Sequence, residues 1–413
     1  MKIFIHTMYF LPDSGSAPIL MNELAENLAA QGRDVEVVTT LPRPPHNRGY
    51  EGRLYVREKR SGFRVKRFPT NFTVHHIGRL IAWSIYTLLT WINLVKVRRG
   101  DVVFLRLPPL QLGITGILAR RLRGARVVLN VQDIHPDLSI ESGLLRNPFF
   151  ITAAQTFEKF IYRQMDEILV ISEGFRRNLL AKGVPSEKIE ILPNWVDTDF
   201  LSPRPKNNPV ARRYGLADKF VLMYSGTISI SSSVTLERIL EAADRLRDDP
   251  GIRIAIVGEG LKKADLTAKA KELGLPNVEF IPFQPYADLP DLLGAADVLL
   301  VPLDKEKSLL SVPSKLYNFM AAGRPILGLA HSDSEVFQII RDTGCGTCAP
   351  PDDPSAIAAA ILALRADPAG RLTMGRNGRA YAEGTVSRRV VLDSFDRLLT
   401  KSVCFQPGQG KIA

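Results

Sequence analysis

Short apolar runs alternate with longer amphipathic segments along most of this chain. In the first half the apolar runs predict strands at Lys2–His6, Val35–Val38, Phe63–Phe68, Val102–Leu105, Arg126–Val131 and Glu167–Ser172. In the second half they predict strands at Phe220–Ser225, Ile252–Gly258, Val278–Ile281, Asp297–Pro302 and Pro325–Ala330. Several runs are apolar at successive positions, which is typical of parallel strands that are covered on both faces. Helical patterns such as Ile19–Ala30 and Leu110–Leu122 lie between them.

Two such series predict an α/β protein with two Rossmann-like, doubly wound domains that face each other across a cleft. The polar stretch 202–208 separates the two series. The predicted boundaries are 1–200 for the first domain, 201–384 for the second, 385–402 for a C-terminal helix that packs back toward the first, and 403–413 for a tail.

The composition of the 413 residues is that of a globular protein, with 45% apolar and 23% charged residues. Low-complexity, collagen-like and largely disordered chains are thereby excluded. Three cysteines cannot form a disulfide scaffold, which indicates a reducing compartment. Cys345 and Cys348 match C-x-x-C without a thioredoxin-like context, and a structural role is favoured over a redox role.

The net charge of +11 suggests an anionic partner. Nine Lys and Arg residues but only two Glu lie between Arg43 and Arg67, and the charge-free run Leu80–Val95 follows. As a helix this run would be about 24 Å long, too short to cross a bilayer. Residues 43–99 therefore indicate either an anionic membrane surface or a buried helix beside a solvated basic loop. No signal-peptide pattern precedes them, so a cytoplasmic, peripheral location is expected.

Three loops carry small, hydroxyl or charged residues where a strand ends. Gly15 and Ser16 precede the first helix, and Ser16 is a candidate helix cap. Gly226 and Thr227 follow a strand of the second half, before a helix expected from Val234 with Ser233 as its cap, and Gly258-Glu259 follow the next strand. Open α/β sheets bind ligands at this edge, although each loop could also be a simple connection.

The segment around Lys315 is the most informative. Pro313 and Ser314 predict a helix start, which places Ser314, Lys315 and Asn318 in or near its first turn. A lysine in the first turn opposes the helix dipole, so this lysine indicates a bound anion such as a pyrophosphate. An amphipathic helix with a polar cap is the simpler alternative.

The segments Tyr9–Thr40, Met223–Thr227, Val257–Gly260 and Pro313–Pro325 resemble family 4 glycosyltransferases, and the similarity extends over nearly the whole chain. The bacterial exopolysaccharide subgroup, with its colanic-acid-type fucosyltransferases, is the most similar. The resemblance implies a GT-B fold, retention of configuration at the sugar C1, and no obligatory metal or other cofactor. It also implies a nucleoside diphosphate sugar bound mainly by the second domain. The predicted donor-binding residues are Gly15, Ser16, Gly226, Thr227, Gly258, Glu259, Ser314, Lys315, Leu316 and Asn318.

The chain departs from the broad family at two positions. That family has two glutamates eight positions apart, where this chain has Leu310 and Asn318. The basic pair after the glycine-rich turn is also absent, and we infer that Lys315 replaces it as the catalytic cation. The subgroup resemblance supports Asn318 as normal for this branch, while an inactive homologue is the alternative.

The acceptor side is predicted at the loop after Arg126–Val131. Asp133 is the first candidate for assisting deprotonation of the acceptor hydroxyl, and His135 is the second. A helix cap with solvated acids explains the loop equally well, and a metal site is not favoured.

These observations predict a retaining hexosyltransferase that acts on a saccharide acceptor linked to a polyprenyl diphosphate, in exopolysaccharide or cell-surface glycan synthesis. An inverting GT-B transferase or a nucleotide-sugar epimerase is the rival enzyme. A basic module that binds nucleic acid or membrane is the non-enzymatic rival, but no nucleic-acid motif is present and no nucleic-acid partner is expected.

Overall fold

The computed structural model describes residues 1–70, 76–141, 143–303 and 312–401. Within these residues the first part of the chain forms an eight-stranded sheet in the order β3-β4-β2-β1-β5-β6-β7-β8. Its strands are β1 (Lys2–His6), β2 (Asp34–Thr40), β3 (Val56–Arg60), β4 (Phe63–Phe68), β5 (Val102–Leu107), β6 (Arg126–Val131), β7 (Glu167–Val170) and β8 (Ile189–Ile191). β1 pairs in parallel with β2 and β5, whereas the edge strand β3 is antiparallel to β4.

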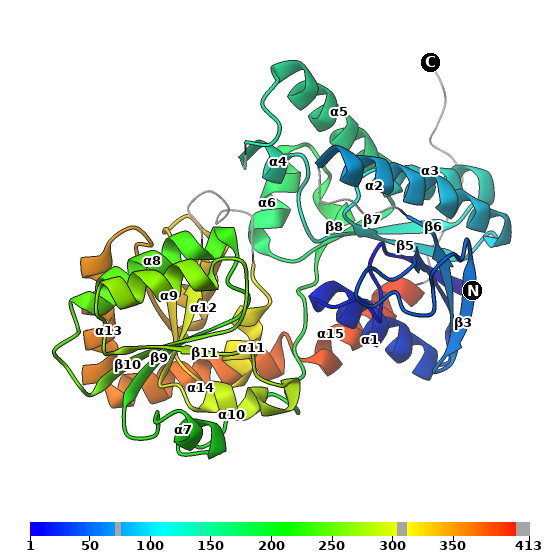
Figure 1. Ribbon diagram of the computed structural model, residues 1–413. Helices are drawn as coiled ribbons and strands as arrows, with labels where there is room; N and C mark the ends of the chain where they lie inside the picture. The colour runs from blue at the N-terminus through cyan, green and yellow to red at the C-terminus, as the bar shows by residue number, and fades with distance from the viewer. Residues whose placement is uncertain (71–75, 142, 304–311, 402–413) are drawn as a thin grey trace. The chain divides into compact units, whose positions relative to one another are not determined.

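Helices cover both faces of this sheet (Figure 1). The helical segments are α1 (Ser16–Ala30), α2 (His76–Trp91), η1 (Ile92–Lys96), α3 (Leu112–Arg123), α4 (Asp137–Glu141), α5 (Pro148–Gln164), α6 (Glu173–Ala181) and η2 (Ser186–Lys188). In Figure 1, α2 and α3 lie above strands β5 and β6, and α1 lies below them. The strands between these layers are buried on both sides, which explains their continuous apolar sequence.

The second part forms a six-stranded sheet in the order β11-β10-β9-β12-β13-β14, and every strand pairing in it is parallel. Its strands are β9 (Phe220–Ser225), β10 (Ile252–Val257), β11 (Val278–Ile281), β12 (Val298–Pro302), β13 (Ile326–Leu329) and β14 (Gly346–Ala349). The chain runs outward from β9 in one direction and then returns to build β12 to β14 on the other side. The order of strands therefore reverses between β9 and β12, where doubly wound sheets bind their ligands.

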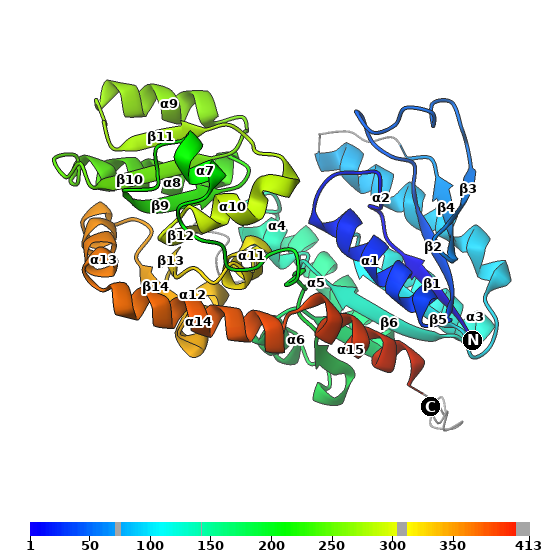
Figure 2. The ribbon, with the colours of Figure 1, turned by 90° about the horizontal axis from the view of Figure 1, so that it is seen from below.

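Two apolar clusters fill the space on the two faces of this sheet. The helical segments are α7 (Pro209–Arg213), α8 (Ile230–Asp244), α9 (Lys263–Glu272), η3 (Tyr286–Asp288), α10 (Leu289–Gly294), α11 (Lys315–Ala321), α12 (Glu335–Thr343), α13 (Pro354–Ala366), α14 (Pro368–Gly384) and α15 (Arg388–Thr400). Helices α8, α9 and α13 cover one face, while α10, α11 and α14 cover the other (Figure 2). The predicted α/β class with doubly wound parallel sheets is confirmed.

By its internal contacts the chain divides into two compact units. One comprises Met1–Asn130, Gln164–Leu169 and Val391–Ala413, and the other comprises Val131–Arg163 and Val170–Val390. Within the first unit, Phe395 of α15 packs edge to face on Phe104 of β5, and Asp396 accepts a 2.9 Å hydrogen bond from Arg33. The boundaries at 200, 384 and 402 stay predictions, and the predicted tail lies outside the described residues.

Three strands did not follow from the apolar pattern. β3 has the sequence VREKR and lies at a sheet edge, where one face meets water and charged side chains are tolerated. β8 has only three residues, and β14 consists of small residues. No helix in the described part of the chain is long and apolar enough to cross a membrane.

Candidate functional site

The turns after β9 and β10 pack against each other at the carboxyl edge of the six-stranded sheet. The Gly226 amide donates to the Val257 carbonyl at 3.0 Å, and the Ile228 amide donates to the Glu259 carbonyl at 2.9 Å. Gly258 has φ of 141°, and a Cβ on it would lie 2.0 Å from the Gly226 carbonyl oxygen. A side chain is therefore excluded at position 258, and the two backbones approach closely.

Lys315 extends to this pair of turns from the first residue of α11. Its Nζ lies 4.2 Å from the centre of the Tyr224 ring, and a Cβ on Gly226 would be 3.0 Å from that Nζ. Burial lowers the pKa of Lys315 to about 8. Among the described residues no carboxylate pairs with this ammonium, so its charge is available to an anion that enters the site.

A pocket of about 240 Å³ opens beside the two turns. Its lining residues are Ser225, Gly226, Thr227, Val257, Gly258, Glu259, Phe283, Gln284, Leu289 and Leu292. Phe283 is 71% exposed although it is a large aromatic residue, and its solvent-exposed ring lines the pocket. Gln284 is fixed by hydrogen bonds to the Tyr214 hydroxyl at 2.9 Å and to the Pro282 carbonyl at 2.8 Å. The pocket thus joins apolar walls with a few fixed polar groups, as ligand sites do.

The structure brings Gly226, Thr227, Gly258, Glu259 and Lys315 together. Glu259 has its carboxylate 2.7 Å from the Lys263 ammonium at the exposed rim, which lowers the Glu259 pKa. Thr227 uses its carbonyl oxygen to accept the Tyr224 hydroxyl at 2.7 Å, and its own side chain is exposed.

The other predicted residues of α11 differ in their accessibility. Ser314 is exposed and lies at the predicted helix start as the N-cap residue of α11, but its side chain makes no capping hydrogen bond. Leu316 is fully buried in the apolar core, and its amide donates to the Pro313 carbonyl at 3.0 Å. Asn318 is partly exposed one turn later. Leu310, which replaces one family glutamate, lies outside the described residues.

Two helix starts predicted from sequence were wrong. α1 begins at Ser16 with Gly15 as its N-cap, so Ser16 is not the cap. α8 begins at Ile230, four residues before the expected start, because Ser229 and Ser232 form a capping box. Consecutive serines and threonines offer several equivalent caps, and the sequence alone did not distinguish Ser229 from Ser233.

Gly15 and Ser16 are exposed, and Gly15 has φ of 115°, a conformation that favours glycine. They belong to the compact unit that contains β1, whereas Lys315 belongs to the other unit. Their predicted contact with a donor stays a prediction.

The loop after β6 carries Asp133 and His135, which are the predicted acceptor-side residues. His135 Nδ1 lies 3.2 Å from the Ser139 hydroxyl. Asp137, two residues later, accepts a hydrogen bond from Asn178 at 2.9 Å and forms a 2.9 Å ion pair with Lys182. Lys182 also pairs at 2.7 Å with Glu158, whose side chain is fully buried. This network anchors α4 to α5 and α6, and the loop that carries Asp133 and His135 directly precedes α4.

The side chains of Cys345 and Cys348 are structural rather than reactive. Burial raises the pKa of the Cys345 thiol to about 11 and that of Cys348 to about 12, so both are poor nucleophiles at neutral pH. Among the described residues no group of three or more His, Cys, Asp and Glu side chains is arranged to hold a metal ion.

Comparisons with known proteins identify the family. Residues 15–195 match the glycosyl transferase 4-like domain, and residues 213–381 match the glycosyl transferases group 1 domain. A colanic acid biosynthesis glycosyl transferase, WcaI of Escherichia coli K12, is 30% identical over 96% of this chain and 98% of its own length. The chain belongs to the family 4 glycosyltransferases.

A second relative is a GDP-mannose-dependent phosphatidylinositol monomannoside mannosyltransferase of Mycolicibacterium smegmatis, which is 28% identical over 78% of this chain and 80% of its own. Among solved structures, Anabaena HepE in complex with UDP superposes with a TM-score of 0.72 at 16% identity, over 97% of this glycosyltransferase and 100% of that chain. The predicted GT-B fold class is thereby confirmed.

Sequence reasoning missed three residues of this glycosyltransferase. Phe283 and Gln284 follow β11 and line the pocket, and only their position at a strand's carboxyl end could have suggested them. Lys182 has no motif around it. Its role depends on Asp137 and Glu158, which are 45 and 24 residues away along the chain, and no local pattern reports such a contact.

Proposed function

We propose that this glycosyltransferase is a retaining hexosyltransferase that uses a nucleoside diphosphate sugar. The observation that carries the proposal is the desolvated Lys315 ammonium beside Gly226, at the point where the strand order reverses. A diphosphate placed there would supply the counter-charge that this ammonium lacks among the described residues. Retention itself rests on the family resemblance.

In the proposed mechanism the bond from the sugar C1 to the diphosphate oxygen breaks while the acceptor oxygen bonds to C1 on the same face, and negative charge grows on the leaving diphosphate. Lys315 stabilises this charge, and the close-packed turns after β9 and β10 allow the phosphates to approach the backbone. Asp133 is proposed to accept the proton of the acceptor hydroxyl, with His135 as the second candidate. We propose that no metal is obligatory, because Lys315 supplies the cation.

The nucleobase is proposed to lie in the pocket at Phe283. An exposed aromatic ring offers a stacking surface, and the Gln284 backbone and the Glu259 carboxylate offer polar contacts at the rim. Relatives and solved neighbours are named with both GDP-mannose and UDP, so the nucleoside stays open. The colanic-acid relative supports exopolysaccharide or cell-surface glycan synthesis as the pathway class.

The acceptor is proposed to be a saccharide linked to a polyprenyl diphosphate. Such an acceptor lies at the cytoplasmic face of a membrane, and we propose peripheral attachment there through residues 43–99. The hexose and the fucosyltransferase subgroup stay predictions.

A thermal-shift screen with GDP-, UDP- and dTDP-sugars tests the donor proposal, because a ligand that binds only the folded state raises the melting temperature. We expect one nucleoside series to stabilise the protein and the Lys315→Met variant to lose most of that shift. The product's anomeric configuration, read by NMR, then tests retention. Inversion would support the rival transferase, an isomerised free donor would support an epimerase, and no shift with any donor would contradict the proposal.

A further inference from the structure

The helix α2 and its continuation η1 have two apolar faces. One face packs on the sheet through residues that include Trp83, Tyr86 and Leu94, and the Tyr86 hydroxyl donates to the Val38 carbonyl at 2.8 Å. The opposite face is exposed and carries Leu80, Ile81, Ile85, Leu88, Trp91, Ile92 and Val95. We call these seven residues the α2 stripe. The sequence left open whether Leu80–Val95 lies on an anionic membrane surface or is a buried core helix. In the structure one apolar face of the helix is buried and a second apolar face is exposed.

The spacing within the α2 stripe is that of one helix face, since Ile81, Ile85, Leu88, Ile92 and Val95 alternate at steps of four and three. Its length from Leu80 to Val95 is about 22 Å. The sequence from residue 59 to residue 100 contains no Asp or Glu but nine Lys and Arg residues. An apolar stripe with cations near both ends and no acid is typical of a helix that lies in the interface of an anionic bilayer.

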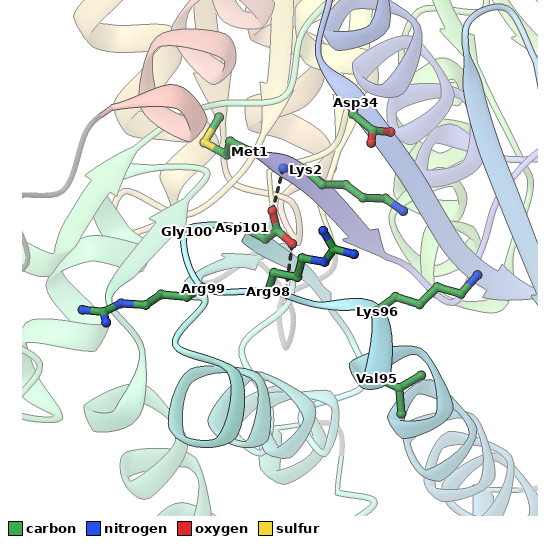
Figure 3. Close-up of a pocket in the computed structure, with 9 residues that line it drawn as sticks. All are labelled: Met1, Lys2, Asp34, Val95, Lys96, Arg98, Arg99, Gly100 and Asp101. Atoms are coloured by element: carbon green, nitrogen blue, oxygen red, sulfur yellow. Dashed lines mark hydrogen bonds between the residues drawn. The ribbon is translucent and has the colours of Figure 1, made fainter.

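A basic pocket of about 800 Å³ adjoins one end of the α2 stripe (Figure 3). Val95 is 70% exposed and belongs to both the stripe and the pocket lining. Figure 3 shows the side chains of Lys2, Lys96 and Arg98 extending toward one side of the pocket, while Arg99 points away. This pocket lies at the amino ends of β1, β2 and β5, the edge opposite to the carboxyl ends where α/β sheets bind substrates.

A second pocket of about 520 Å³ continues the first and shares Lys2 and Lys96 with it. Together they are lined by eight cationic side chains and four carboxylates, which are Lys2, Arg57, Lys59, Arg64, Lys66, Lys96, Arg98 and Arg99 against Asp34, Glu36, Glu58 and Asp101. We call this pair of pockets the amino-edge basic site.

The carboxylates of this site are already engaged. Asp101 accepts the backbone amides of Lys2 at 2.8 Å and Arg98 at 2.9 Å. Glu36 pairs with Lys2 at 2.6 Å and also with Lys66.

Glu58 binds Arg67 at 2.6 Å and Arg60 at 3.0 Å, and neither arginine lines the two pockets. Lys96 and Arg98 pair with no carboxylate among the described residues. Burial lowers the pKa of Lys66 to about 8, Glu36 opposes that shift and the nearby Lys96 ammonium adds to it. The site therefore holds more positive charge than its own acids neutralise.

We propose that the α2 stripe and the amino-edge basic site together form a docking face for an anionic membrane surface. The stripe enters the bilayer at headgroup depth, and Lys96 and Arg98 bind the phosphate of an acidic phospholipid. This deepens the proposed peripheral attachment and does not depend on the transfer reaction. A protein partner would cover the stripe but leave the cations unexplained, and self-association would bring like charges together.

Trp91 provides a direct test with the unaltered protein. The chain has three tryptophans, and Trp83 and Trp195 are only 7% and 6% exposed, whereas Trp91 lies in the stripe at 37%. We expect vesicles with about one third phosphatidylglycerol to shift the tryptophan emission to the blue, and brominated lipids to quench it. Phosphatidylcholine vesicles should bind at least about tenfold more weakly, and the difference should shrink with added salt. No sugar donor is present, so the transferase function can stand if this test fails.

Two double variants separate the two parts of the face. Leu88→Ser with Ile92→Ser should weaken binding to both kinds of vesicle, and Lys96→Gln with Arg98→Gln should weaken only anionic binding, by roughly 10- to 30-fold. Leu362→Ser with Leu372→Ser and Arg341→Gln with Arg376→Gln are matched controls, because these side chains are also exposed but lie elsewhere. The controls should bind as the parent does.

Four results would overturn the proposal. The first is a Trp91 emission that vesicles do not change. The second is vesicle binding that survives both double variants. The third is a dimer in light scattering that the Leu88→Ser, Ile92→Ser variant dissociates, which would make the stripe an interface between copies. Binding of free glycerol 3-phosphate without binding of vesicles would equally contradict a lipid site.

Discussion

Lys315 and Lys182 are both desolvated lysines in the larger compact unit, and their surroundings differ in one respect. Lys182 holds two carboxylates, Asp137 at 2.9 Å and Glu158 at 2.7 Å. Lys315 has an aromatic ring and a glycine turn around its ammonium, and no described carboxylate. A buried ammonium that is paired with carboxylates joins elements of the fold. A buried ammonium without such a partner lowers the stability unless a ligand supplies an anion. The comparison therefore separates a structural lysine from the lysine that we propose to bind the donor.

Removing Lys182 should produce the largest effect. In the Lys182→Met variant, Asp137 and Glu158 lose their cation while Glu158 remains fully buried. We expect the free energy of unfolding, measured by urea denaturation at neutral pH, to fall by about 3–5 kcal/mol. Lys269→Met is the matched control, since Lys269 also holds two carboxylates, Glu237 and Glu241, but at the surface. In Lys269→Met the free energy of unfolding should fall by about 1 kcal/mol or less.

The pH dependence of the Lys182→Met variant distinguishes lost electrostatics from lost packing. Burial already raises the pKa of Glu158 above its usual value, and Lys182 opposes that shift. Without Lys182 the folded-state pKa should rise further. A raised carboxyl pKa favours folding at acid pH and loses that contribution as pH rises through the folded pKa. The difference in the free energy of unfolding between the parent and Lys182→Met should therefore become smaller toward acid pH. A difference that is the same at every pH would contradict the charge explanation.

Removing Lys315 should mainly affect turnover. With Lys315→Met we expect the turnover number to fall by about 30- to 1000-fold, which corresponds to about 2–4 kcal/mol of lost transition-state stabilisation. The free energy of unfolding should stay equal or rise, because the variant removes a desolvated charge that no carboxylate among the described residues pairs with. Steady-state kinetics with the identified donor, beside the Lys269→Met control, measure the change. Full turnover in Lys315→Met would remove the role assigned to this residue.

The two lysines also mark how far sequence reasoning extends. The position of Lys315 in the first turn of α11 could be predicted because its signal is local, a helix start directly after Pro313 and Ser314, while its role in donor binding stays a prediction. The alternating apolar runs likewise predicted the strands β1, β4, β6, β9 and β11 at their observed bounds. These features depend on neighbours within a few residues, which the pattern of the sequence records.

Lys182 could not be predicted, because its partners come from two other helices. The same holds for Phe283, which reaches the pocket only through the pairing of β11 with β10. The start of α8 was wrong for a different reason, since several adjacent hydroxyl residues could cap the helix and only the backbone conformation selects Ser229. Two kinds of information thus came only from the structure: the contacts between distant segments, and which of several adjacent hydroxyl residues caps a helix.

The smallest expected effect is the pH dependence of donor binding. In the donor-free protein the pKa of Lys315 is about 8, and a bound diphosphate should raise this pKa. Donor affinity should therefore be constant below pH 8 and fall up to about tenfold per pH unit above it, with proton uptake on binding. Titration calorimetry in buffers of different ionisation enthalpy measures that uptake, and Lys315→Met should show none.

The free energy of unfolding should change with pH in the opposite direction to donor affinity, and measuring it is therefore an independent check. Because the folded-state pKa lies below the usual value of 10.5, the unfolded chain binds more protons between about pH 8 and 10.5. Over that window the contribution of Lys315 makes the donor-free protein more stable as pH rises, relative to Lys315→Met, while its donor affinity falls. Only an uncompensated lysine produces both trends together. If affinity and relative stability were both flat across this window, Lys315 would be compensated in solution, and the contrast with Lys182 would disappear.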